Sequence, residues 1–311
     1  MVQEVVLAVD IGGTKISAGL VGPDRKVRRH IVISTPANEP DIGDALQGLL
    51  TSVTDYTRPA AIGVASAGPV DPQHGTVSPI NIPAWRNFPL VDLVSATVPE
   101  LPVTLVGDAI AAAVGEHWVG AGRGATAMLG IVVSTGVGGG LVLDGAPYPG
   151  PSGNAGHLGH IVVDPAGPRC SCGATGCVET YASGPSMARW AREHGWSGPD
   201  ARALAADAAG GNTVAQRAYD RGAEALARAI TTAATLCDLD RVVIGGGVSG
   251  AGRVLFAPLQ RHLDRLSTSD FAGRTTVYPA ALGGHAGLLG AAHNALSAAR
   301  TAPRPSDILL R

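Results

Sequence analysis

The chain has 311 residues, of which 45% are hydrophobic and 15% charged, and its formal net charge is −2. This length suffices for two packed α/β domains. The near-neutral charge, with no dense Lys/Arg block, excludes the phosphate-neutralising surface of a nucleic-acid-binding protein. No apolar stretch approaches the ~20 residues that cross a bilayer, and the N-terminus has no basic region or cleavage site. We expect a cytoplasmic protein with no nucleic-acid or membrane partner.

The N-terminal part predicts a hairpin-rich sheet followed by a helical crossover. Apolar runs within residues 5–33 are broken by glycines at 12–13 and by Gly-Pro-Asp at 22–24, which predicts three successive antiparallel strands. Apolar residues at helical spacing predict a helix within 41–57, and a buried strand follows at 60–68.

The middle of the chain predicts a second sheet that resembles the first. Residues 101–120 run from a strand into an alanine-rich helix, which places Asp108 where the chain leaves a sheet. Residues 126–145 then form two apolar runs around a glycine-rich loop at 134–140. Two hairpins of similar character predict an internally duplicated fold with a cleft between its halves.

The remainder predicts helices and strands that complete the second half, and it suggests a division of the chain. We expect helices over 185–196, 201–211, 215–239, 254–266 and 286–296, and strands over 241–249 and 275–282. The predicted division is a small α/β lobe at 1–107, with a C-terminal helix at 297–311 packing back on it, and a large α/β lobe at 108–296.

The first candidate phosphate site is the hexapeptide from Asp10 to Lys15, where a predicted strand ends. Gly12 and Gly13 let backbone N–H groups approach an anion closely. Asp10 can hold Mg²⁺ through water, while Thr14 and Lys15 offer donors. The alternative is an ordinary glycine hairpin turn.

Two further glycine-rich turns are candidates for nucleotide binding. The loop at 134–140 offers hydroxyls and backbone amides, and a flexible hairpin is its alternative. A triphosphate requires donors from several sides, so two such loops are more informative than one. The turn after the strand at 241–249 can hold a base or ribose, although it matches neither a P-loop nor the Rossmann spacing. The candidate residues are Ser134, Thr135, Gly136, Val137, Gly138, Gly246 and Gly247.

Asp108 is the candidate catalytic base. Its carboxylate would lie at the positive end of a helix, where it can accept the proton of an attacking hydroxyl. The alternative is a helix N-cap, for which Asp is a preferred residue. Capping and catalysis are compatible.

The most specific chemical signal is a cluster of three cysteines, Cys170, Cys172 and Cys177, in a chain without a secretion signal. In a reducing compartment this clustering indicates metal binding before disulfide bonding. With His160, the thiolates would complete a tetrahedral Cys₃His site of the closed, structural kind that zinc prefers. Free structural cysteines are the alternative. Cys237, in an apolar helix, is interpreted as a core residue.

Together these motifs resemble the ROK family (repressors, open reading frames and kinases) across essentially the whole chain. The resemblance implies an α/β, actin-like ATPase (ribonuclease H-like) duplicated fold, with two lobes and a central cleft that closes on ATP and sugar. It also implies a homodimer or homotetramer. The matching stretches are DIGGTK at 10–15, SAGPVD at 66–71, PINIPAW at 79–85, GDAIAAAVGE at 107–116, STGVGGG at 134–140, GHLGH at 156–160, CSCGATGCVETYASG at 170–184 and VIGGGVS at 243–249.

The resemblance implies a role for each motif in ATP-dependent sugar phosphorylation. Asp108 matches the family's general base. The residues that match its sugar-contacting set, besides Asp108, are Gly68, Asn81, His160 and Glu179. Those that match its two phosphate loops are Asp10 through Thr14 and Thr135 through Gly138. The family's structural zinc ligands match His160, Cys170, Cys172 and Cys177, so His160 would join the metal to the sugar.

Two positions depart from the family pattern and bear on the acceptor. Gly107 replaces an Asn that normally touches the sugar, and His157 replaces a sugar-binding Glu. The second change resembles bacterial N-acetylmannosamine kinases, whereas 79–90 and 304–311 look more like actinobacterial glucokinases. We assign His157 to the substrate and expect phosphorylation of the C6 hydroxyl of N-acetylmannosamine, with glucose and N-acetylglucosamine as alternatives.

Two hypotheses from outside enzymology also follow from the resemblance. Some family members are sugar-sensing regulators with a helix-turn-helix domain before the kinase-like body, but here DIGGT begins at residue 10 and leaves no room for one. A sugar-binding protein without catalysis is conceivable because of Gly107. The presence of Asp10, Asp108 and both phosphate loops argues against it.

Overall fold

The computed structural model describes residues 5–36, 39–55, 57–79, 85–267, 269 and 272–301. The chain divides into two compact units. Unit 1 comprises Met1–Val119, Pro149–Asn154 and Gly284–Arg311, and unit 2 comprises Gly120–Tyr148 and Ala155–Gly283.

This division differs from the predicted boundary at residue 107. Two helices that the prediction assigned wholly or mainly to the large lobe, α3 (Asp108–Val119) and α9 (Ala286–Thr301), belong to unit 1. Helix α9 begins at Ala286, as the predicted helix at 286–296 does, and continues without a break into the first residues of the predicted C-terminal helix at 297–311; residues 302–311 lie outside the described part of the chain.

Unit 1 is built on a five-stranded mixed sheet in the order β3-β2-β1-β4-β7. Strand β1 pairs antiparallel with β2 and parallel with β4, and β2 pairs antiparallel with β3. The three predicted antiparallel strands are therefore confirmed. The elements are β1 (Val6–Ile11), β2 (Lys15–Val21), β3 (Val27–Ser34), α1 (Glu39–Thr54), β4 (Ala61–Ser66), β5 (Val70–Asp71), β6 (Thr76–Val77), α2 (Leu90–Thr97), β7 (Val103–Gly107), α3 and α9.

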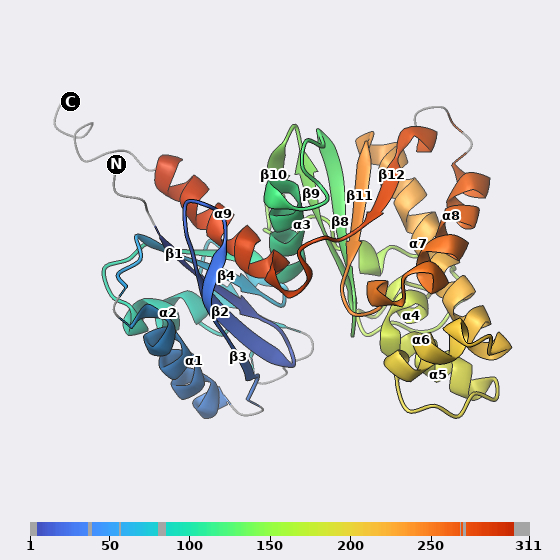
Figure 1. Ribbon diagram of the computed structural model, residues 1–311, viewed down its shortest axis with the longest axis horizontal. Coiled ribbons are helices and arrows are strands. Elements are labelled where there is room, and N and C mark those ends of the chain that lie inside the picture. The colour runs from blue at the N-terminus through green and yellow to red at the C-terminus, as the bar shows by residue number, and fades with distance from the viewer. Residues whose placement is uncertain are drawn as a thin grey trace. The chain divides into compact units, whose positions relative to one another are not determined.

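Helix α9 packs on β1, β4 and α3 within unit 1 (Figure 1). The approach is close because glycines face the helix at two points. A Cβ at Gly63 would overlap the carbonyl of Ala291, and one at Gly115 would overlap that of Ala286. Alanine-rich, glycine-spaced segments thus let a helix from the end of the chain lie directly against the first sheet.

Unit 2 repeats the sheet of unit 1 with the order β10-β9-β8-β11-β12. Strand β8 pairs antiparallel with β9 and parallel with β11, as β1 does with β2 and β4. The predicted duplication is confirmed. The elements are β8 (Ala127–Val133), β9 (Val137–Leu143), β10 (Ala146–Tyr148), η1 (Leu158–His160), α4 (Glu179–Ala182), α5 (Gly184–Glu193), α6 (Ala201–Ala209), α7 (Thr213–Cys237), β11 (Arg241–Gly245), η2 (Ser249–Ala251), α8 (Arg253–Leu266), η3 (Ala272–Arg274) and β12 (Thr276–Pro279); η4 (Gly283–His285) leads into α9.

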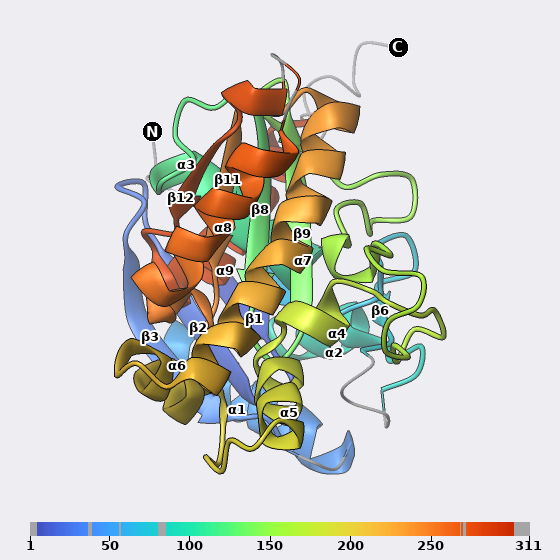
Figure 2. The ribbon, with the colours of Figure 1, turned by 90° about the vertical axis from the view of Figure 1, so that its right-hand side faces the viewer.

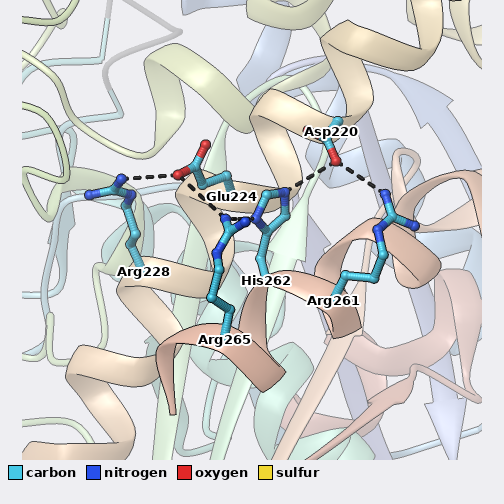
Figure 3. Close-up of polar contacts among 6 residues, drawn as sticks. All are labelled: Asp220, Glu224, Arg228, Arg261, His262 and Arg265. Carbon is cyan, nitrogen blue, oxygen red and sulfur yellow. Dashed lines mark hydrogen bonds and ion pairs between the residues drawn. The ribbon is translucent and has the colours of Figure 1, made fainter. Parts of the chain in front are cut away.

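Helices α7 and α8 lie side by side across one face of the second sheet (Figure 2). A polar network joins them (Figure 3). The buried His262 of α8 is 3.1 Å from an oxygen of Asp220 through Nε2, and Arg265 approaches its Nδ1 at 2.7 Å. Because arginine is always a donor, Nδ1 accepts and Nε2 donates. Both nitrogens of this buried imidazole are therefore satisfied.

Each unit has its own hydrophobic core. In unit 1 the core includes the fully buried Trp85, which stacks on Phe88 with ring centroids 4.4 Å apart. In unit 2 it lies between β8, β11 and the helices α5 to α8, around residues such as Tyr219 and Leu226. Two separate cores fit the predicted two-lobe organisation. Within the described ranges, every helix is too short or too polar to span a bilayer.

Candidate active site

The carboxyl ends of three parallel strands lie side by side in unit 1, and predicted site residues follow them. The register pairs Ile11 of β1 with Ser66 of β4, and Ser66 with Gly107 of β7. Asp108 is the first residue of α3, which confirms its predicted place at a strand-to-helix junction. Its Oδ1 accepts the N–H of Ala109 at 2.7 Å. The carboxylate therefore lies at the positive end of a helix.

Asp10 is a second carboxylate at the same edge of the sheet. Burial and, to a smaller extent, the negative charge of Asp108 raise the pKa of Asp10 from 3.8 to about 7, while the positive charge of Lys15 acts in the opposite direction. Two carboxylates that influence each other in this way favour a proton or a cation between them. The structure thus brings the predicted base and the predicted Mg²⁺-linked residue together within one unit.

The N-terminal turn of α9 contributes to this edge as well. A Cβ at Gly287 would overlap the carboxylate of Asp10, so only glycine allows the backbone of α9 to come this close. The positive end of α9 therefore faces Asp10. The sequence analysis assigned no role to Gly287.

The turn between β1 and β2, the predicted first phosphate loop, is a tight hairpin. The N–H of Gly12 donates to the carbonyl of Lys15 at 2.9 Å, and Thr35 donates its hydroxyl to the carbonyl of Gly12 at 2.7 Å. The side chains of Thr14 and Lys15 are exposed, and Gly12 and Gly13 are partly exposed. Thr35, the residue after β3, therefore fixes the turn from one side, and the side chains of Thr14 and Lys15 remain accessible.

The loop after β4 contains Gly68, the predicted sugar contact of this unit. Asn154 fixes this loop, because its Oδ1 accepts the N–H of Val70 at 3.1 Å and its Nδ2 donates to the Val70 carbonyl at 2.9 Å. Asn154 was not predicted, since nothing local links it to a loop 84 residues earlier. Asn81, the other predicted sugar contact near this loop, lies outside the described residues.

In unit 2 the second and third glycine-rich turns lie next to each other, because β8 and β11 are parallel neighbours. Gly245 pairs with Val132, and the N–H of Val248 donates to the Val133 carbonyl at 3.0 Å. Gly246 has φ +90°, and a Cβ there would overlap the backbone of Val133. Ser134 and Thr135 are exposed at the tip of the loop, with Gly136, Val137, Gly138 and Gly247 beside them.

The predicted sugar residues of unit 2 come from two segments. His157 precedes the short helix η1 and His160 is its last residue, with their ring centroids 6.2 Å apart and their planes nearly parallel. Glu179 begins α4, and its Oε2 accepts the N–H of Val137 at 2.9 Å. A residue predicted to contact sugar is thus hydrogen-bonded to the second phosphate loop.

The predicted metal ligands converge. The four ligand atoms of His160, Cys170, Cys172 and Cys177 lie within 4.8 Å of one another. Cys170 Sγ is 3.7 Å from His160 Nδ1, and Cys172 Sγ is 3.7 Å from Cys177 Sγ. Tetrahedral zinc with Zn–S bonds of about 2.3 Å implies sulfur–sulfur separations of roughly 3.8 Å. The donor set and its spacing therefore fit structural zinc.

The electrostatics of the thiols agree with a cation site. Burial raises the pKa of Cys177 to about 12, with the neighbouring Cys172 and Cys170 adding to the shift. The backbone N–H of Ala174 lowers the pKa of Cys172. A buried thiol of this kind needs a bound cation to ionise near neutral pH. Because His160 Nδ1 faces the sulfurs, its Nε2 remains for another partner.

Two equal five-stranded sheets, each with a glycine-rich hairpin at its first strand pair, define the class as the actin-like ATPase fold. The ROK family model matches residues 6–298, and the chain belongs to this family. It is a sugar kinase, a phosphotransferase with an alcohol group as acceptor.

The relatives differ in the sugar that their names state. A glucokinase of Thermotoga maritima is 35% identical over 305 residues, which cover 92% of this chain and 96% of the relative. An N-acetylmannosamine kinase of Escherichia coli is 41% identical over 245 residues, with 78% and 82% covered. A ROK family glucokinase from Streptomyces griseus, solved with glucose and AMPPNP, is 34% identical with a TM-score of 0.83, and 94% of this chain and 99% of that chain are covered.

Proposed function

We propose that the protein transfers the γ-phosphoryl group of ATP to the C6 hydroxyl of N-acetylmannosamine. Asp108 accepts the hydroxyl proton while the C6 oxygen forms its bond to the γ-phosphorus. The bond from that phosphorus to the β–γ bridging oxygen breaks, and ADP leaves. Mg²⁺ supplies charge neutralisation on the phosphates when it is bound.

The protein's own residues bind the phosphates and the nucleoside. In unit 1 Thr14, Lys15 and the amide of Gly13 donate to phosphate oxygens, and Asp10 would hold Mg²⁺ through water. In unit 2 the loop at 134–138 supplies a second set of donors, and the turn at Gly246 and Gly247 receives the nucleoside.

The observation on which the proposal rests is the pairing of Asp108 with Asp10. A base that takes a proton from an alcohol must lie beside the phosphate loop, because the attacking oxygen and the γ-phosphorus come within bonding distance. Asp108 is near enough to Asp10 for its charge to raise the pKa of Asp10. This supports one reaction centre at the carboxyl edge of the first sheet.

The choice of N-acetylmannosamine rests on His157. This exposed imidazole stands where the family resemblance expects a Glu that grips ring hydroxyls, and it lies beside the His160 ring. A neutral imidazole offers one donor and one acceptor where a carboxylate offers only acceptors. This change suits a sugar whose 2-substituent is an acetamido group. Glucose is the second candidate, because relatives that match most of the chain are glucokinases.

A coupled assay of ADP release over a panel of hexoses and N-acetylhexosamines tests this choice. We expect the highest kcat/KM for N-acetylmannosamine, and His157→Glu should raise the ratio of kcat/KM for glucose to that for N-acetylmannosamine. A higher kcat/KM for glucose than for any N-acetyl sugar would overturn the assigned acceptor, although it would leave the kinase assignment in place.

We propose in addition that zinc occupies the Cys₃His site and that the chain assembles as a homodimer or homotetramer. Structural zinc would fix the segment from Cys170 to Cys177 and hold His160 so that Nε2 donates to a sugar hydroxyl. Elemental analysis and light scattering of the purified protein test the two statements. A preparation without zinc that retains full activity would contradict the first, and a monomer at micromolar concentration would contradict the second.

A further inference from the structure

We infer that Glu179 is a positioning residue for the second phosphate loop as well as a sugar contact, so that one carboxylate couples the acceptor site to the phosphoryl-donor site. The inference deepens the proposed function and rests on it for the identities of the two ligands. The contact itself lies wholly within unit 2 and can be measured in the free protein.

The loop at 134–140 has few bonds of its own that fix its tip. The N–H of Ser134 donates to the Gly136 carbonyl at 2.8 Å, which closes a tight turn. The next amide, that of Val137, is at the start of β9 and donates to Glu179 Oε2 at 2.9 Å. A charge-assisted bond of this type is among the stronger ones a backbone amide makes. Glu179 therefore fixes where the turn joins the strand.

The loop is also shaped around this carboxylate. A Cβ at Gly136 would stand 2.7 Å from Glu179 Oε2, which is closer than a real Cβ contact. A glycine at this point lets the loop wrap onto the carboxylate. The loop and Glu179 therefore fit each other at two successive residues, Gly136 and Val137.

Glu179 is itself held by the segment that contains the metal ligands. It begins α4 two residues after Cys177, whose carbonyl accepts from Thr180 through both the backbone N–H at 3.0 Å and the hydroxyl at 2.7 Å. Two residues after α4 ends, the N–H of Gly184, the first residue of α5, donates to the Ser134 carbonyl at 2.9 Å. The loop is thus contacted from the start of α4 and from the start of α5, and the Cys₃His segment anchors the start of α4.

The carboxylate of Glu179 has two oxygens, and each can accept a hydrogen bond from a different partner. While Oε2 holds the Val137 amide, the other oxygen can accept a hydrogen bond from a sugar hydroxyl. Binding of the sugar would then immobilise the carboxylate and with it the phosphate loop. By linkage, a nucleotide held by the ordered loop would favour sugar binding to the same extent.

Amide hydrogen exchange at Val137 in the protein without nucleotide tests the inference. We expect Glu179→Ala to speed exchange of this amide by about tenfold or more. Glu179→Gln keeps an acceptor oxygen and should remain within about threefold of the wild type, because the bond persists in weaker form. Sugar should slow the exchange in the wild type and leave it unchanged in Glu179→Ala.

Asp240 supplies a matched control at the other end of β8. Its carboxylate accepts the backbone N–H of Thr126 at 2.7 Å and that of Ala127 at 3.3 Å. Asp240→Ala should speed exchange of those two amides and leave Val137 unchanged. Equal exchange at Val137 in the wild type and Glu179→Ala would overturn the inference, and so would a similar acceleration in Asp240→Ala.

A second variant addresses the loop without removing the carboxylate. Gly136→Ala should displace Glu179 Oε2 from the Val137 amide, speed exchange of that amide and raise KM for both ATP and sugar. A rise in KM for ATP alone would contradict the coupling. These exchange measurements do not depend on turnover. Absence of kinase activity toward every sugar would therefore contradict the proposed function, but the contact between Glu179 and the loop could still be measured.

Discussion

The two glycine-rich hairpins occupy the same place in the two sheets but hold their loops in different ways. In unit 1 the turn between β1 and β2 lies beside Asp10 and Asp108, two carboxylates that follow neighbouring strands. In unit 2 the turn between β8 and β9 has hydroxyls in the corresponding place, and its carboxylate, Glu179, comes from a separate helix after the metal segment. In the proposed function both turns bind phosphate, with proton transfer assigned to unit 1 and loop positioning assigned to unit 2.

The first prediction from this difference between the units is that removal of the base Asp108 in unit 1 affects turnover far more than stability. Asp108→Ala should lower kcat about a thousandfold, while the midpoint of thermal unfolding changes little. Asp92 offers a control, since it is also an acidic residue in the first turn of a helix of unit 1. Asp92→Ala should turn over at the wild-type rate, and comparable rates in the two variants would remove Asp108 from its proposed role.

The second prediction concerns the metal segment of unit 2. Cys177→Ser should reduce bound zinc from about one per chain to near zero and lower the unfolding midpoint by about 10 °C. Exchange of the Val137 amide should also accelerate, because α4 loses its anchored start. Cys237→Ser, at the end of α7, should retain zinc. Full zinc content in the Cys177 variant would refute the ligand set.

The third prediction follows from the raised pKa of Asp10, from 3.8 to about 7. In the folded protein this group keeps a proton that the unfolded chain releases above pH 3.8. Its favourable contribution is therefore complete at low pH and is lost as the pH rises through about 7. Relative to Asp10→Asn, the free energy of unfolding of the nucleotide-free wild type should fall between about pH 4 and 7, by up to about 4 kcal/mol.

Denaturant titrations of both proteins over this pH range measure that difference. Contributions from other titrating groups cancel when the two curves are subtracted. A difference that is flat with pH would show that Asp10 is not buried beside a second negative charge, and one that rises with pH would contradict the sign.

The smallest predicted effect is on the third turn. Gly246→Ala should reduce the free energy of unfolding by about 2 kcal/mol or more, because φ is +90° and a Cβ meets the Val133 backbone. Gly250→Ala, where a Cβ meets nothing within 4 Å, should be nearly neutral. Equal stability of the two variants in thermal melts would contradict the close packing of the turn against β8.

Local patterns predicted much of the fold and part of the site. Turn glycines between apolar runs predicted both hairpins, the strand before Asp108 and the alanine-rich helix after it predicted that junction, and the spacing of the cysteines predicted the metal cluster. These features are determined within a few residues. The sequence analysis did not find contacts between segments that are distant in the chain.

Three such contacts complete the site. Gly287 lies against Asp10, Asn154 fixes the loop at Val70, and Glu179 holds Val137. Each depends on a close backbone approach or on one hydrogen bond between elements whose neighbourhood is set by sheet order and helix packing. No periodicity or spacing in the sequence indicates these contacts. The place of α9 in unit 1 could not be predicted for the same reason: its packing on β4 and α3 depends on single glycines, and the sequence shows only an alanine-rich helix pattern.

The most direct test of the central claim is the identity of the phosphorylated atom. The purified protein should be incubated with ATP, Mg²⁺ and N-acetylmannosamine, and the sugar product examined by phosphorus–proton correlation NMR. The account predicts coupling of the new phosphorus to the two protons on C6. Coupling to the anomeric proton, or release of inorganic phosphate with no sugar phosphate, would contradict it.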